Sequence, residues 1–131
     1  MDEYMIKDAF LSLRAYKAEK LLLQKRMAAE VQPSSDVFKR IEFIDHQIQR
    51  VEIWMELLSE DEAYVVKRHL VDGIDIGRIA VEYKDRWGEE FAKTDRSLRS
   101  YQRKALKKIL LFESGRRPLD QESVQMKSDT F

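Results

Sequence analysis

The feature that most constrains the fold is an apolar seam at strict heptad spacing in residues 37–58. Its members follow one another in steps of four and three residues, and most are β-branched: Val37, Ile41, Ile44, Ile48, Val51, Met55 and Leu58. Such a repeat is typical of a helix that packs along its length against another helix. The sequence therefore predicts a coiled-coil-like α-helix with a helical partner.

The preceding residues are expected to supply that partner. Residues 2–31 contain neither Gly nor Pro, and their apolar residues recur at helical steps. Residues 32–35, Gln-Pro-Ser-Ser, end this helix, and Ser34 or Ser35 can cap the next one. The short connection favours an antiparallel hairpin within one chain. A second copy of the chain, in a homodimer through these N-terminal helices, is the alternative.

Three shorter helices are expected between residues 59 and 113. Ser59 and Glu62 have the spacing of a capping box, and Gly73 is placed to end the helix that they start. Asp75 can cap a second helix that extends to Trp87. The expected apolar stripes of these two helices are Ala63, Val66 and Leu70, then Ile76, Ile79, Ala80, Tyr83 and Trp87.

The last of the three helices is expected to begin after Thr94 and to end at Ser114-Gly115. Its stripe is Leu98, Tyr101, Ala105, Ile109 and Phe112. We therefore predict an all-α protein with a helical hairpin in residues 1–58, a three-helix domain in 59–113 and a disordered tail in 114–131.

The composition argues against most classes of enzyme and against a membrane protein. The chain has no cysteine and only His46 and His69, so neither a thiol nucleophile nor a metal cluster can be assembled, and no cofactor is indicated. We expect no enzyme. Apolar runs stop at three or four residues and 37% of the residues are charged, which predicts a cytoplasmic protein with no membrane partner.

The net charge of zero conceals an uneven distribution. Residues 1–62 hold 9 basic and 13 acidic residues, a net charge of −4. Residues 94–117 hold 8 basic and 2 acidic residues, a net charge of +6. A basic segment of this density, carried by a helix, is typical of proteins that bind nucleic-acid phosphates.

The order of a helix, a Gly-bearing turn, a second helix and a capped basic helix is that of a helix-turn-helix DNA reader. In residues 58–62, 73–80 and 94–110 the sequence resembles region 4 of bacterial sigma factors, most specifically from Leu98 to Ile109. Residues 81–93 depart from that pattern and are longer by about eight residues. The overall plan is similar to ArpU- and RinA-type phage regulators of late genes, which implies transcriptional control of packaging or lysis genes.

The resemblance implies a set of groove-facing residues on the basic helix. Arginine suits bidentate bonding to guanine, whereas lysine attracts phosphates regardless of sequence. The candidate DNA-binding residues are Thr94, Asp95, Arg96, Arg99, Ser100, Arg103, Lys104 and Lys107.

Two further interpretations remain open beside the regulator of double-stranded DNA. One is a phage DNA-packaging adaptor of the small-terminase kind, which predicts a large ring oligomer. The other is a region-4-like module that docks bacterial RNA polymerase without reading DNA.

Overall fold

A computed structural model describes residues 1–30, 32 and 34–115, and all regular secondary structure in this part of the chain is helical. The predicted all-α class is confirmed. The helices are α1 (Glu3–Ala29), α2 (Ser35–Glu56), α3 (Glu60–Val66), the π-helix η1 (Lys67–Val71), α4 (Ile76–Trp87), the 3-10 helix η2 (Glu89–Phe91) and α5 (Asp95–Glu113). The prediction of disorder beyond residue 115 lies outside the described residues.

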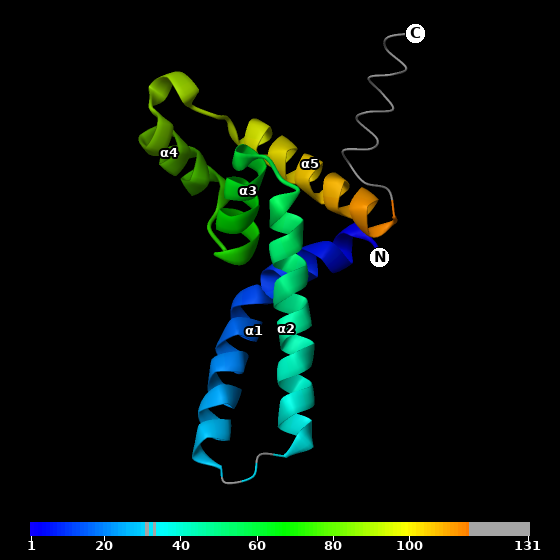
Figure 1. The fold of residues 1–131 in the computed structure, drawn as a ribbon. Helices are drawn as coiled ribbons and strands as arrows, with labels where there is room; N and C mark the ends of the chain where they lie inside the picture. Colours follow the sequence, from blue (N-terminus) through cyan, green and yellow to red (C-terminus); the bar gives the residue numbers. More distant parts are fainter. Residues whose placement is uncertain (31, 33, 116–131) are drawn as a thin grey trace.

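The molecule has a stalk and a head (Figure 1). α1 and α2 run side by side in opposite directions and form the stalk. α3, α4 and α5 gather at the end of the stalk where α2 ends, and they form the head. α1 bends where the stalk meets the head, and its first turns lie beside the end of α5. Among the described residues, no helix combines the length and the apolar character needed to cross a membrane.

The heptad seam of α2 is used within the chain. Ile44, Ile48 and Val51 are buried, and the other seam residues pack at least partly against the same core. In the structure α1 packs along this seam within the same chain. Trp54 does not belong to the predicted seam, yet it is completely buried. The reason is that α2, near its C-terminal end, contacts α5 as well as α1.

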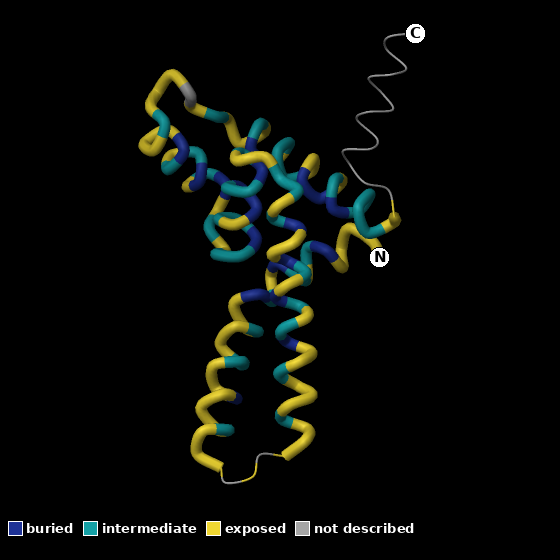
Figure 2. Tube along the Cα trace, viewed as in Figure 1, coloured by how far each residue is buried: buried dark blue, intermediate teal, exposed yellow. Residues whose placement is uncertain are grey.

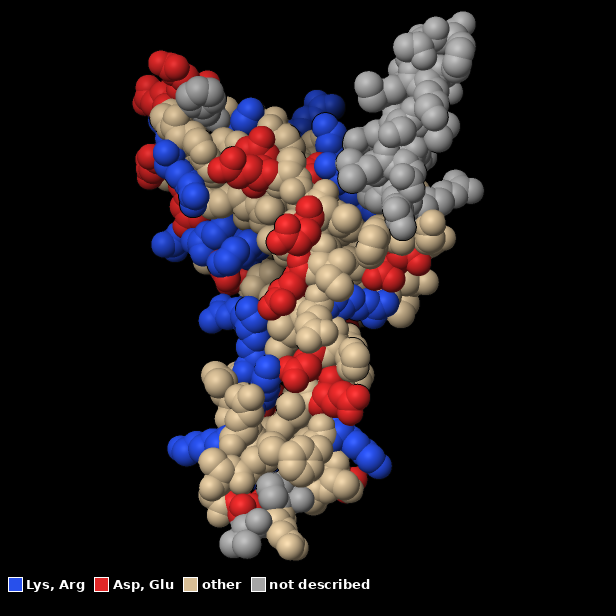
Figure 3. Space-filling view, viewed as in Figure 1, with Lys and Arg blue, Asp and Glu red and all other residues tan. Residues whose placement is uncertain are grey.

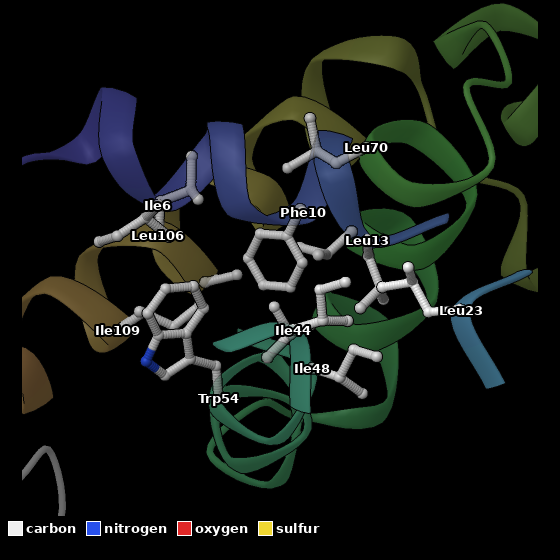
Figure 4. Packing of buried hydrophobic residues seen from close by; sticks show 13 residues of the cluster. Ile6, Phe10, Leu13, Leu23, Ile44, Ile48, Trp54, Leu70, Leu106 and Ile109 are labelled. Carbon is white, nitrogen blue, oxygen red and sulfur yellow. The ribbon is translucent and has the colours of Figure 1, made fainter. Parts of the chain in front are cut away.

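The larger core spans the junction of stalk and head (Figure 4). Phe10 of α1 meets Trp54 of α2 with ring centroids 5.7 Å apart, and Leu106 and Ile109 of α5 belong to the same cluster. The Trp54 indole donates a hydrogen bond to Glu113 at 2.6 Å. The end of α5 is therefore fixed to both helices of the stalk.

The helix starts follow the predicted caps with two exceptions. Ser59 and Glu62 form the complete capping box, and Thr94 accepts a hydrogen bond from the Ser97 amide at 3.1 Å. Ser34 and Asp75 also stand at the cap positions, but their side chains make no capping bond. At these two positions the extended backbone, rather than the side chain, begins the helix.

Burial separates the two regions of the molecule (Figure 2). Buried residues concentrate in the head and at the junction, whereas most of the stalk surface is exposed. A second, smaller core lies inside the head and joins α3, α4 and the first half of α5 through Val65, Ile76, Ile79, Tyr83 and Leu98. This smaller core positions the start of α5.

Candidate nucleic-acid interface

The two sides of α5 differ sharply in chemistry. Leu98, Ala105, Leu106 and Ile109 are buried on one side. The predicted basic residues lie on the other, at helical steps that place them in one row, and all are exposed: Arg96, Arg99, Arg103, Lys104 and Lys107. Figure 3 shows Lys and Arg side chains along the upper edge of the head, where α5 lies.

The remaining predicted site residues stand at the start of this row. Thr94 and Asp95 are exposed, and Ser100 is half-buried. The Thr94 side chain caps α5 through its bond to the Ser97 amide, and Asp95 lies in the first turn, where the helix dipole favours an acidic group. All of the predicted residues therefore come together on one helix and around its N-terminus.

The outward side of α5 is hollowed rather than flat. A hollow of about 400 Å³ lies along it and is lined by Arg96, Ser97, Ser100, Tyr101, Arg103 and Lys104. Its lining is mostly polar, with guanidinium, ammonium and hydroxyl groups as donors. Beside it, the Lys93 ammonium lies 5.8 Å from the centre of the Tyr101 ring. The hollow suits an anionic, hydrogen-bond-accepting surface.

The basic residues of α5 divide into two groups by their partners. Within the described residues, none of the five outward ones forms an ion pair with an acidic side chain. Lys108 belongs to the same basic segment but turns inward and binds Glu62 at 2.8 Å. The positive charge of the outward row is therefore directed at solvent, whereas that of Lys108 is neutralised within the fold.

Polar contacts fix α5 against the rest of the head. Glu62, only 4% exposed, both completes the capping box of α3 and accepts the bond from Lys108. His69 of η1 lies 2.5 Å from the side-chain oxygen of Gln102. The spacing of the capping box predicted the role of Glu62 at the helix start. It predicted neither the bond from Lys108 to Glu62 nor the contact of His69 with Gln102, because such pairs depend on how the helices pack.

A charged cluster holds α4 against η1. The Arg68 guanidinium donates two hydrogen bonds to Glu82, at 3.0 and 2.7 Å, and one to Asp72 at 2.8 Å. The bonds from Arg68 lower the pKa of Glu82 below its usual value. Desolvation raises the pKa of Asp72, but Arg68 and Lys67 outweigh it and lower that pKa overall. The cluster therefore favours ionised carboxylates.

Aromatic packing orients the end of α4. Tyr83 and Trp87 lie 4.1 Å apart between ring centroids, and Tyr64 of α3 packs edge-on against both rings. The Tyr83 hydroxyl donates a hydrogen bond to Asp61. Burial, together with this carboxylate, raises the pKa of the Tyr83 hydroxyl. This aromatic cluster holds the C-terminal end of α4 in place, where the connection to α5 begins.

The connection between α4 and α5 differs from that of a simple helix-turn-helix. Residues 88–94 join the helices and include η2, whereas the usual turn has about three or four residues. Gly88 begins this connection with φ +92°, a backbone conformation that residues other than glycine rarely adopt. As predicted, α4 extends through Trp87. More residues therefore separate α4 and α5 than in the general helix-turn-helix pattern, although α5 still packs on α3 and α4.

The described part of the chain offers no alternative metal centre. Its His, Asp and Glu side chains nowhere gather in a group of three or more that could hold an ion. Comparisons with protein-family models, curated proteins and solved structures yield no match. The similarity to sigma region 4 therefore rests on the sequence motifs alone.

Proposed function

We propose that the protein is a sequence-specific regulator of transcription that binds double-stranded DNA through α5. One observation carries the proposal: five basic side chains form an exposed row on α5, directly opposite the stripe that anchors the helix in both cores. An α-helix with such a face fits the major groove of DNA, which is about 12 Å wide. The rigid anchoring supports direct readout because it holds the side chains in one register.

The residue types support different tasks along the row. Arg96 and Arg99 are the leading candidates for base contacts, since a guanidinium can bond to two acceptors of guanine at once. Arg103, Ser100 and Asp95 can add further contacts on the same side. Lys104 and Lys107, with Thr94 and the free amides at the start of α5, are suited to phosphates.

The sigma-region-4 resemblance supports a more specific role. Small phage and prophage regulators with a helical N-terminal part and a region-4-like module control late genes for packaging or lysis. We extend the proposal to that class of gene control, in the cytoplasm of a bacterial host. The long α4–α5 connection is the main structural departure from it.

The experiment that tests the proposal is selection of random duplex DNA by the purified full chain at moderate salt, followed by sequencing. We expect an enriched motif that disappears in the double variant Arg96→Ala/Arg99→Ala. The matched control is Arg26→Ala/Lys39→Ala, which removes the same charge from exposed positions on the stalk and should leave the motif unchanged.

Other outcomes point to the alternative functions. No enrichment by an intact, helical protein would overturn sequence-specific binding. Polymerase binding that survives the loss of Arg96 and Arg99 would favour a docking module instead. A large ring in sedimentation would favour the packaging adaptor.

A further inference from the structure

A partly open cavity of about 280 Å³ lies where the two helices of the stalk meet η1. η1 packs against α1 at this junction (Figure 1). The lining is mostly apolar, and its apolar members are the buried or half-buried side chains of Leu13, Val51, Met55 and Val71. Sites for small molecules are typically concave and apolar with a few polar groups, and their volumes begin at about 300 Å³. The cavity therefore has the character of a site for a small ligand.

Lys17 explains why the chain does not fill this space itself. Ile6, Phe10 and Leu13 are buried on one side of α1 and follow steps of four and three residues, and the next step of four leads to Lys17. Lys17 is exposed and lines the cavity. A lysine at such a position lowers the stability of a helix pair, whereas an apolar residue would pack between the helices. The cation is accounted for if this position serves a ligand.

The charged residues around the cavity leave an excess of positive charge. Lys67 and Asp72 form an ion pair with each other at 3.4 Å. Arg14, Lys17 and Glu52 are exposed, and within the described residues none of them forms an ion pair. Two unpaired cations and one unpaired carboxylate therefore surround the apolar lining, and their sum favours a ligand with a single negative charge.

A π-helix forms one wall of the cavity. The Asp72 amide donates a hydrogen bond to the Lys67 carbonyl oxygen, five residues back, at 2.9 Å. Lys67, Val71 and Asp72 of this turn line the space. π-helical turns are rare and frequently occur at functional sites. The backbone thus points to the same place as the volume and the charges, and it does so independently of them.

We propose that this cavity binds a small organic monoanion, a carboxylate whose ring or short chain lies against Leu13, Val51 and Met55. Arg14 and Lys17 bind the carboxylate, since hydrogen bonds between ionised groups are the stronger ones. An apolar cavity of about 150 Å³ can hold benzene. The volume of about 280 Å³ therefore suits a ring with a short acidic chain. A phosphate monoester, with a charge of about −1.5 to −2, matches the surrounding charges less well.

The site is separate from the basic row of α5. The residues that line the cavity belong to α1, α2 and η1 with its C-terminal cap. Binding of the carboxylate is therefore measured without DNA, and its outcome does not depend on whether α5 binds DNA.

Titration of the methyl-labelled full chain with hydrocinnamate, followed by NMR, tests the site. We expect saturable shifts of the methyl signals of Leu13, Val51, Met55 and Val71. The neutral amide of hydrocinnamate has the same shape and should bind about tenfold or more weakly, because the bonds to a charged group are lost. Phenylpropylamine, a cation of the same length, should bind more weakly still.

Substitutions test the roles of the charge and of the space. Arg14→Gln and Lys17→Gln should each raise the dissociation constant of hydrocinnamate about tenfold. The matched control is Lys25→Gln, which removes a charge from an exposed position of α1 outside the cavity and should leave the constant unchanged. Since all three positions are exposed, helical content by circular dichroism should stay the same. Val71→Phe keeps every charge but fills the space, and it should abolish the saturable shifts.

Several results would overturn the proposal. They are no saturable binding by the wild type, equal binding of the acid and its amide, tighter binding of the amine, and a dissociation constant that neither glutamine variant changes. Shifts confined to α5 would also overturn it, because the probe would then bind the basic row as a simple anion.

Discussion

The outward faces of α1 and α5 present opposite chemistry on helices that are anchored in the same core. α1 exposes apolar side chains such as Leu11, Leu21 and Leu22, whereas α5 exposes a row of arginines and lysines from Arg96 to Lys107. Both helices bury their other side around Phe10, Trp54 and Ile109. Inward faces of similar composition build one fold, whereas the exposed faces of the two helices differ in chemistry.

The largest expected effect comes from removing the side chain that joins the two anchored helices. Trp54→Ala should lower the free energy of unfolding by about 3–5 kcal/mol, because it empties the junction between α1, α2 and α5. It also leaves Glu113 without its indole donor. Urea denaturation followed by far-ultraviolet circular dichroism measures the loss. Ile53→Ala, at an exposed neighbouring position, should change stability by less than about 0.5 kcal/mol.

Salt should weaken the proposed binding of DNA through α5. If about five cations of α5 engage phosphates, the logarithm of DNA affinity should fall with the logarithm of salt concentration at a slope of about −4 to −5. That slope corresponds to a loss of several hundredfold between 50 and 200 mM salt. Fluorescence anisotropy on DNA over a series of salt concentrations gives the slope, and an affinity that does not change with salt would contradict phosphate contacts by α5.

Local sequence signals predicted most of the helix boundaries. The capping box at Ser59 and Glu62, the cap at Thr94, the positive φ of Gly73 and the extension of α4 to Trp87 follow from short-range chemistry, and the structure has them. The periodicity of α5 likewise separated its buried side from its basic side. Such features need only a few neighbouring residues, so a single sequence reveals them.

Contacts between distant helices were beyond the reach of such reasoning. Three such contacts depend on how α5 packs against the rest of the molecule: the burial of Trp54, its bond to Glu113 and the pairing of Glu62 with Lys108. Lys108 shows the consequence: it counts as a basic residue of the segment, yet the packing turns it inward.

The charged cluster under α4 should make the stability depend on pH. The lowered pKa of Glu82 means that its stabilising effect is complete above the ordinary value of about 4.5 and is lost as the pH falls through the lower folded-state pKa. Glu82→Gln removes this dependence, so the urea midpoint should fall less steeply below pH 4.5 than in the wild type. The variant should also be less stable at pH 7, although by less than Trp54→Ala. Parallel acid profiles of wild type and variant would disprove this role of the cluster.

The smallest expected effect concerns the start of α5, the proposed DNA-binding helix. Thr94→Ala removes the side-chain acceptor for the Ser97 amide and should lower the free energy of unfolding by about 1 kcal/mol. Because the cap also orders the first turn that carries Arg96, DNA affinity should fall as well. Thr94→Ser keeps the hydroxyl and should retain both stability and affinity. If the serine variant binds DNA as weakly as the alanine variant, the methyl group rather than the cap is what matters at this position. That result would separate the cap of α5 from the function of its basic face.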